Sequence, residues 1–72
     1  MRDITNFQTD LLRTFVSVID LGAYTKAGDA LGRTQPAISL QMRRLEQLIG
    51  APLIKQAGRS LVLTKEGEML LS

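Results

Sequence analysis

The residues of this 72-residue chain that could do chemistry lie in one short run, TQPAISLQMRRLE at positions 34–46. The amide of Gln35, the hydroxyl of Ser39 and the guanidinium groups of Arg43 and Arg44 can donate hydrogen bonds, and guanidinium groups also bind anions. Catalysis has few candidates, because the chain has no histidine and no cysteine, and histidine is the commonest general base and metal ligand. The sequence therefore predicts recognition and not an enzyme, with no catalytic and no metal-binding residue.

The run 35–49 predicts a helix with two different faces. Pro36 is tolerated because it lies in the first turn, and Gly50 ends the helix. At about 100° per residue, the buried stripe comprises Ile38, Met42, Leu45 and Ile49. The opposite face comprises Pro36, Leu40, Arg43 and Gln47, flanked by Ser39 and Arg44. An apolar Leu40 in the middle of an outward, basic face indicates a binding partner.

Double-stranded DNA fits this face, because the major groove admits one α-helix and displays hydrogen-bonding base edges and the thymine methyl group. Gln35 is suited to adenine, whereas Ala37 and Leu40 are suited to thymine methyl groups. The arginines are suited to phosphate or guanine, and the free N–H groups at the start of the helix form an anion site. Arg33, just before the helix, is expected near a DNA backbone strand.

Each residue also has a simpler interpretation. Gln35 would cap the helix, Ser39 would bond back to its own helix, and Leu40 would be a scattered exposed apolar residue. Arg43 would be solvated or would pair with Gln47 or Glu46. An arginine at a loop tip, such as Arg59, would serve solubility alone.

The charge distribution also indicates an anionic partner. The net charge of the chain is +2, but residues 1–32 carry −1, residues 33–65 carry +5 and the last seven residues carry −2. A positive middle segment on a nearly neutral chain favours an anionic ligand. The alternative is a solvated basic surface.

Two helices are predicted before this run. In the first, apolar residues recur at helical spacing, with Thr9 or Asp10 as N-cap and Gly22 as the stop. Its expected core residues are Leu12, Phe15, Val16 and Ile19. The second runs from Thr25 as N-cap to a stop at Gly32, and its small residues, such as Gly28, would let a neighbouring helix approach closely. With the helix at 35–49 it forms a helix-turn-helix.

After Pro52 the pattern becomes β-prone. The runs 53–55 and 61–63 predict a small hairpin, with Gly58 at its tip. Thr64 then caps a last helix that begins at Lys65 and is still apolar where the chain ends. We therefore expect either that the natural chain continues or that a partner covers this helix.

Length and composition predict one small cytoplasmic domain without repeats or linkers. Seventy-two residues are near the lower limit for a single core. No apolar run approaches the roughly 20 residues that span a bilayer. The N-terminus, where Arg2 is followed by Asp3, lacks the apolar core of a signal peptide. No membrane partner is expected.

The segments KAGDALGRTQPAISLQMRRLEQLIGAPLI (residues 26–54) and GRSLVLTKEG (residues 58–67) together resemble the N-terminal winged helix-turn-helix domain of LysR-type transcriptional regulators. The resemblance extends from about Asp10 to Leu71. It implies a mainly α fold with a three-helix core and a two-stranded wing at 53–63. It also implies that residues 63–72 begin a linker helix that pairs two subunits.

The resemblance further implies sequence-specific binding of double-stranded DNA by a bacterial regulator, with the helix at about 35–49 in the major groove and the wing on the backbone or minor groove. It implies a homodimer, or a higher oligomer in the full-length regulator, with RNA polymerase as a further partner and a location at the nucleoid. This domain would need no cofactor, since a small-molecule effector would bind a C-terminal domain that is absent here.

The residues predicted to bind DNA, from the helix faces and from the resemblance together, are Thr25, Lys26, Arg33, Thr34, Gln35, Pro36, Ala37, Ser39, Leu40, Arg43, Arg44, Lys55 and Arg59. Those predicted to form a dimer are Met69, Leu70 and Leu71. The chain departs from the family at Leu40, where many members have arginine, and at Gln56, where a basic residue is frequent. Lys55 compensates only in part, because it should point to the other side of the strand.

The main rival interpretation is a protein-interaction module on the same scaffold. Its interface would be formed by the outward Leu40 and the terminal Met69, Leu70 and Leu71. Such a module would bind its partner with little dependence on salt, and it would not bind DNA.

Overall fold

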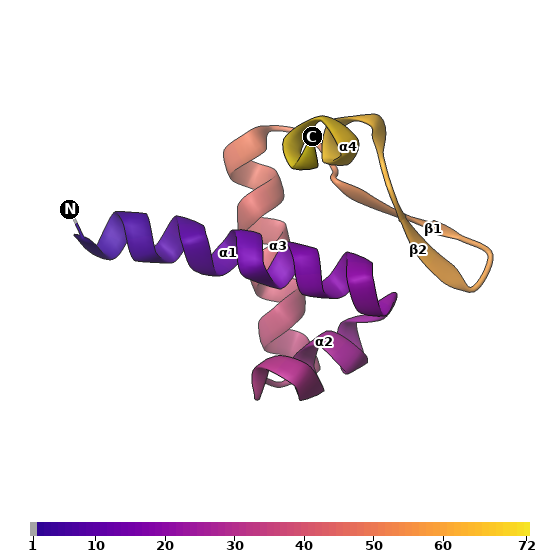
Figure 1. Cartoon of the computed structure of the whole chain (residues 1–72), viewed down its shortest axis with the longest axis horizontal. Coiled ribbons are helices and arrows are strands. Elements are labelled where there is room, and N and C mark those ends of the chain that lie inside the picture. Colours follow the sequence, from indigo (N-terminus) through magenta and orange to yellow (C-terminus); the bar gives the residue numbers. More distant parts are fainter. Residues whose placement is uncertain (1) are drawn as a thin grey trace.

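The computed structural model describes the backbone of residues 2–72 and the side chains of residues 8–72. The elements follow in the order α1 (Arg2–Leu21), α2 (Tyr24–Leu31), α3 (Gln35–Ile49), β1 (Ile54–Ala57), β2 (Ser60–Leu63) and α4 (Lys65–Leu71). In Figure 1, α1 crosses α3, and the hairpin of β1 and β2 extends away from the helices. The predicted mainly α fold with a small hairpin is therefore confirmed.

One apolar core holds α1, α2, α3 and the base of the hairpin together. Its buried members are Leu11, Phe15, Val18, Ala27, Ile38, Met42, Leu45 and Leu53. Three of the four residues predicted for the buried stripe of α3 are among them. The fourth prediction was wrong, because Ile49 is 44% exposed. It is the last residue of α3, and like its neighbour Leu48 it lines an open apolar groove beside Gln8 and Leu12 of α1.

The predicted phase of α1 was partly wrong. Phe15 is buried and Ile19 packs against the core, as expected, but Leu12 and Val16 are 39% and 40% exposed. The buried residues are instead Leu11, one position before Leu12, and Val18, two positions after Val16. Because apolar residues lie on more than one face of this helix, periodicity alone does not determine which face is buried.

Two predicted N-caps were also wrong. The helix α1 begins at Arg2, so Thr9 and Asp10 lie inside it. The helix α2 begins at Tyr24 after an extended Ala23 that makes no side-chain cap, so Thr25 lies in its first turn. Threonine and aspartate also occur inside helices. A capping residue in the sequence is therefore only weak evidence for where a helix begins. The predicted stops are confirmed, since Gly22 and Gly32 both have positive φ.

The turn between α2 and α3 is built on Gly28. A β-carbon on Gly28 would lie 2.6 Å from the carbonyl oxygen of Arg33, and the Arg33 N–H donates to the Gly28 carbonyl oxygen at 2.8 Å. The sequence predicted that the small residues of α2 admit a neighbouring helix. What approaches Gly28 is instead the backbone of the turn, which folds back onto the end of α2.

The hairpin is tighter than the sequence predicted. Strands β1 and β2 pair antiparallel from Ile54 with Leu63 to Ala57 with Ser60, which leaves only Gly58 and Arg59 as the connection. Gly58 has φ of +63°, the conformation that two-residue hairpin turns demand. At the base, Thr64 donates its N–H to the Leu53 carbonyl oxygen at 3.0 Å.

The predicted cap of α4 is confirmed. The Thr64 hydroxyl oxygen accepts a hydrogen bond from the Gly67 N–H at 3.1 Å. It also donates to the Pro52 carbonyl oxygen at 2.6 Å. Thr64 therefore fixes the hairpin and the last helix to the same stretch of backbone.

Replacement Gly28→Ala should lower the free energy of unfolding. Alanine gains about 1 kcal/mol in helix propensity, but its methyl group would displace the Arg33 carbonyl, and such overpacking costs about 1–3 kcal/mol. Urea unfolding measures the net change. The matched control is Ala30→Gly, an exposed site on the same helix that reports the propensity term alone. A Gly28→Ala variant more stable than the parent would contradict the close approach.

Candidate nucleic-acid interface

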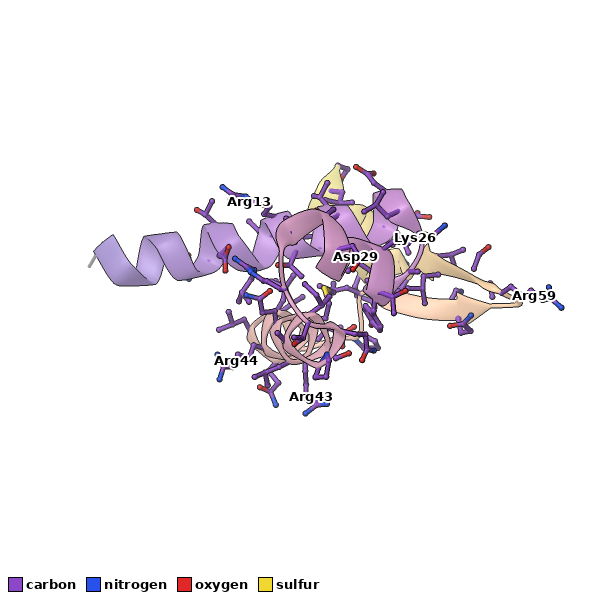
Figure 2. All side chains as sticks on the ribbon, turned by 90° about the horizontal axis from the view of Figure 1, so that it is seen from below. Arg13, Lys26, Asp29, Arg43, Arg44 and Arg59 are labelled. Carbon is purple, nitrogen blue, oxygen red and sulfur yellow. The ribbon has the colours of Figure 1, made fainter. Side chains whose placement is uncertain are left out.

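The outward face of α3 carries the combination that the sequence predicted. Leu40 is 41% exposed, and Arg43 and Arg44 are exposed beside it. Figure 2 shows both arginines projecting from α3 on the side away from α1. An apolar side chain therefore lies between cationic groups on a convex helical surface.

The start of α3 is capped by Thr34 and not by Gln35. The Thr34 hydroxyl oxygen accepts a hydrogen bond from the Ala37 N–H at 3.3 Å. The Gln35 amide nitrogen donates to the Ser39 hydroxyl oxygen at 3.2 Å, so these two predicted contact residues are joined on the exposed surface. The amide oxygen of Gln35 and the second N–H of its nitrogen retain the capacity for a ligand.

The helix α2 and the hairpin add further exposed polar groups. Thr25 and Lys26 lie in the first turn of α2 and are exposed, as are Lys55 and Arg59 on the hairpin. Arg59 lies at the very tip in Figure 2. The Gln56 amide nitrogen donates to the Gly58 carbonyl oxygen at 3.0 Å. Gln56 thus braces the turn that carries Arg59.

Arg33 is engaged within the protein, which the sequence did not predict. Its Nη2 donates to Asp10 Oδ1 at 2.8 Å, and its Nη1 donates to Gln41 Oε1 at 2.8 Å. The Gln41 Nε2 donates to Asp10 Oδ2 at 3.0 Å. Asp10, Arg33 and Gln41 therefore form a closed ring of hydrogen bonds, which we call the α1–α3 clasp.

The buried hydroxyl of Thr14 lies against the α1–α3 clasp. The Thr14 Oγ1 is 2.7 Å from Gln41 Oε1 and 3.1 Å from the Asp10 carbonyl oxygen, and it can donate to either. The clasp joins residues 23 and 31 positions apart. No local spacing in the sequence indicates such pairs, which is why sequence reasoning placed Arg33 on DNA and Asp10 at a cap.

The clasp holds the pKa of the Asp10 carboxyl below its ordinary value of 3.8. The main cause is the hydrogen bond from Arg33, followed by its positive charge, and burial opposes both in part. The two side chains are 31% and 33% exposed, so water screens the pair. The carboxylate is therefore charged at neutral pH.

An apolar groove lies elsewhere on the chain. It is lined by Gln8, Leu12, Leu45, Leu48, Ile49 and Leu70. Of the residues predicted to form a dimer, Met69 and Leu71 are 67% and 42% exposed, whereas Leu70 packs against this chain's own core.

Two findings bear on other classes of function. Among the residues described, no helix is long and apolar enough to cross a membrane. Within residues 8–72, no three acidic side chains gather in a group that would hold a metal ion.

Comparison of sequences places residues 9–68 in a family described as bacterial regulatory helix-turn-helix protein, lysR family. The chain is 50% identical over 70 residues to the HTH-type transcriptional regulator PecT of Dickeya dadantii (strain 3937), covering 97% of this chain and 22% of that protein. It is 46% identical over 66 residues to the HTH-type transcriptional regulator DgdR of Burkholderia cepacia, covering 92% of this chain and 22% of that protein. The chain thus spans about a fifth of the length of these relatives.

Solved structures have the same fold. A complex described as BenM_DBD/catB site 1 DNA is 36% identical, with a TM-score of 0.79 over 85% of this chain and 68% of that one. A CbnR_DBD–DNA complex is 32% identical, with a TM-score of 0.79 over 86% of this chain and 71% of that one. Both neighbours contain DNA.

Replacement Asp10→Asn should reduce stability in a manner that depends on pH. The lowered pKa means that the carboxylate contributes stability above pH 3.8, and this contribution is lost as the pH falls through the lower pKa of the folded state. At neutral pH we expect a loss of up to about 1 kcal/mol, because the pair is partly exposed. Urea unfolding at about pH 7 and about pH 3 should show the difference from the parent shrinking.

The matched control for this prediction is Asp20→Asn, an exposed carboxylate on the same helix. Its difference from the parent should be small at both pH values. A constant deficit of the Asp10→Asn variant across the pH range would mean that the charge of Asp10 is unimportant.

Proposed function

The chain belongs to the LysR family of bacterial regulatory helix-turn-helix proteins, and we propose that it is the domain with which such a regulator binds double-stranded DNA in a sequence-specific manner. The observation that carries the proposal is the outward face of α3, where exposed Leu40 lies beside exposed Arg43 on a fold that two related domains use in complexes with DNA. The chain spans about a fifth of the length of its relatives. The role of the whole protein as a regulator is therefore also proposed.

In this proposal the helix α3 enters the major groove. Gln35 pairs with adenine, Ala37 and Leu40 contact thymine methyl groups, and Ser39 contributes a hydroxyl. Phosphate contacts come from a set of residues that positions the protein without reading sequence: Thr25, Lys26, Thr34, Arg43, Arg44, Lys55 and Arg59. Pro36 has no hydrogen-bond donor, so its ring makes only van der Waals contact with the DNA. For Arg33 the sequence predicted a phosphate contact as well, but its guanidinium already binds Asp10 and Gln41.

The hairpin is proposed to act as the wing. Only Gly58 and Arg59 connect its strands, so the guanidinium of Arg59 is carried well away from the helices (Figure 2). A cation in this position suits a phosphate or the minor groove next to the groove that α3 occupies.

The proposal extends to partners outside this chain. The exposed Met69 and Leu71 and the adjoining apolar groove suit a second copy of the chain, so residues 63–72 would begin a linker and dimerisation helix. A separate effector-binding domain, contact with RNA polymerase and a cytoplasmic location at the nucleoid complete the proposed regulator. Sedimentation equilibrium of the parent chain and of the Met69→Lys variant measures whether two copies associate through this surface.

Selection from a pool of random-sequence duplexes tests the proposal directly. Fluorescence anisotropy at about 50 and about 200 mM salt should show a loss of affinity on the order of 1,000-fold, as expected for several phosphate contacts. Sequencing of the retained DNA should reveal an enriched motif, which is two-fold symmetric if two copies bind. The enriched duplex is called the selected duplex below.

The other outcomes separate the rival interpretations. Salt-dependent binding without an enriched motif would indicate a nonspecific DNA-binding protein. No binding at the lower salt concentration would overturn the DNA-binding proposal, and the exposed Leu40 would then favour a protein interface.

Two substitutions should affect DNA binding in different ways. Arg59→Ala should weaken binding to every duplex and lower the salt slope by about 1, because it removes one phosphate contact. Leu40→Ala should change preference at one base step by about 1 kcal/mol, as expected for an apolar contact with a methyl group, and leave the salt slope unchanged. Salt titrations of both variants on the selected duplex and its single-base variants measure these effects. Equal losses by Leu40→Ala on all duplexes would exclude its role in readout.

A further inference from the structure

We infer that Asp10 and Arg33 act together as positioning residues for DNA recognition, and that Arg33 acts through the recognition helix α3 instead of through a contact of its own with phosphate. This inference rests on the proposed function. It assigns a role in base readout to the α1–α3 clasp, none of whose residues is on the outward face of α3.

The side chain of Arg33 already binds two partners within the protein. Its two terminal nitrogens point to different partners, with Nη2 on the Asp10 carboxylate and Nη1 on the Gln41 amide oxygen, each at 2.8 Å. A charge-assisted hydrogen bond from a guanidinium to a carboxylate is among the stronger protein hydrogen bonds. To reach a phosphate, Arg33 would have to leave Asp10 without its cation.

Arg33 also contacts α1, α2 and α3. Its backbone N–H binds the Gly28 carbonyl oxygen in α2, and its side chain binds Asp10 in α1 and Gln41 in α3. It is also only two positions before Gln35, the first residue of α3. A displacement of Arg33 therefore moves the turn of the chain that carries the proposed base-reading residues.

The members of the clasp bond to one another. The Asp10 carboxylate accepts from Arg33 with one oxygen and from Gln41 with the other. The Thr14 hydroxyl, which is fully buried, lies against the same Gln41 oxygen. Removing one member opens the ring, so the directed hydrogen bonds that fix the orientation of α3 relative to α1 are lost.

The test compares affinity for the selected duplex with affinity for a random-sequence duplex of the same length. The variants are Asp10→Asn, Arg33→Gln, Arg33→Lys and the double variant Asp10→Asn/Arg33→Gln. Partial unfolding lowers both affinities by the same factor, so the ratio of the two affinities reports positioning and is unaffected by a purely structural loss of stability. Circular dichroism measures the folded fraction separately.

If the clasp positions α3, Asp10→Asn should lower the affinity ratio on the order of 10-fold, even though it removes a negative charge. Arg33→Gln and the double variant should show the same loss and no more, because the two residues act as one unit. Arg33→Lys should also lower the affinity ratio, because a lysine keeps the charge but has only one nitrogen with which to bind both Asp10 and Gln41.

The matched control is Asp20→Asn. Asp20 is an exposed carboxylate on the same helix as Asp10. This control should not change the affinity ratio.

A phosphate contact by Arg33 would give a different pattern. Arg33→Gln would then weaken binding to both duplexes and lower the salt slope by about 1, while Arg33→Lys and Asp10→Asn would keep the affinity ratio of the parent. That pattern overturns the inference but leaves the proposed function intact. Failure of the parent chain to bind either duplex would instead overturn the proposed function, and the inference with it.

Discussion

The position of α3 depends on a very short connection held from two directions. Three residues separate α2 from α3, and the backbone of Arg33 packs so closely on Gly28 that a β-carbon there would lie 2.6 Å from its carbonyl oxygen. The side chain of the same residue binds the α1–α3 clasp. A short, doubly anchored turn leaves few orientations for the helix that follows, and the apolar contacts of Ile38, Met42 and Leu45 select among them.

This arrangement divides α3 into two surfaces with separate tasks. The inward stripe is filled by apolar side chains, whereas the clasp joins Asp10 of α1 to Arg33, just before α3, and to Gln41 in the middle of α3. Hydrogen bonds between charged or polar groups are directional, and they weaken steeply as their geometry departs from linear. The clasp therefore adds orientation to a helix that the core already holds, and the outward surface remains available for a ligand.

Much of this architecture could be predicted from local sequence. The bounds of α3, the exposure of Leu40, the cap at Thr64 and the hairpin with Gly58 at its tip follow from helical periodicity, capping chemistry and the residue types of turns. The phase of α1 could not be predicted, because Leu11 and Leu12 are equally apolar and only the packing of α3 distinguishes them. The clasp could not be predicted either, since its members are far apart in sequence and each has an ordinary local interpretation.

The bonds of Thr64 have a mechanical consequence. This one residue separates β2 from α4, and it binds Pro52, Leu53 and Gly67 at the same time. A β-carbon on Gly67 would collide with the Leu53 carbonyl, so the helix is seated directly against the backbone that enters the hairpin. A displacement of α4 would therefore also displace the base of the hairpin. The tip of the hairpin lies farthest from Thr64 and would move through the largest distance.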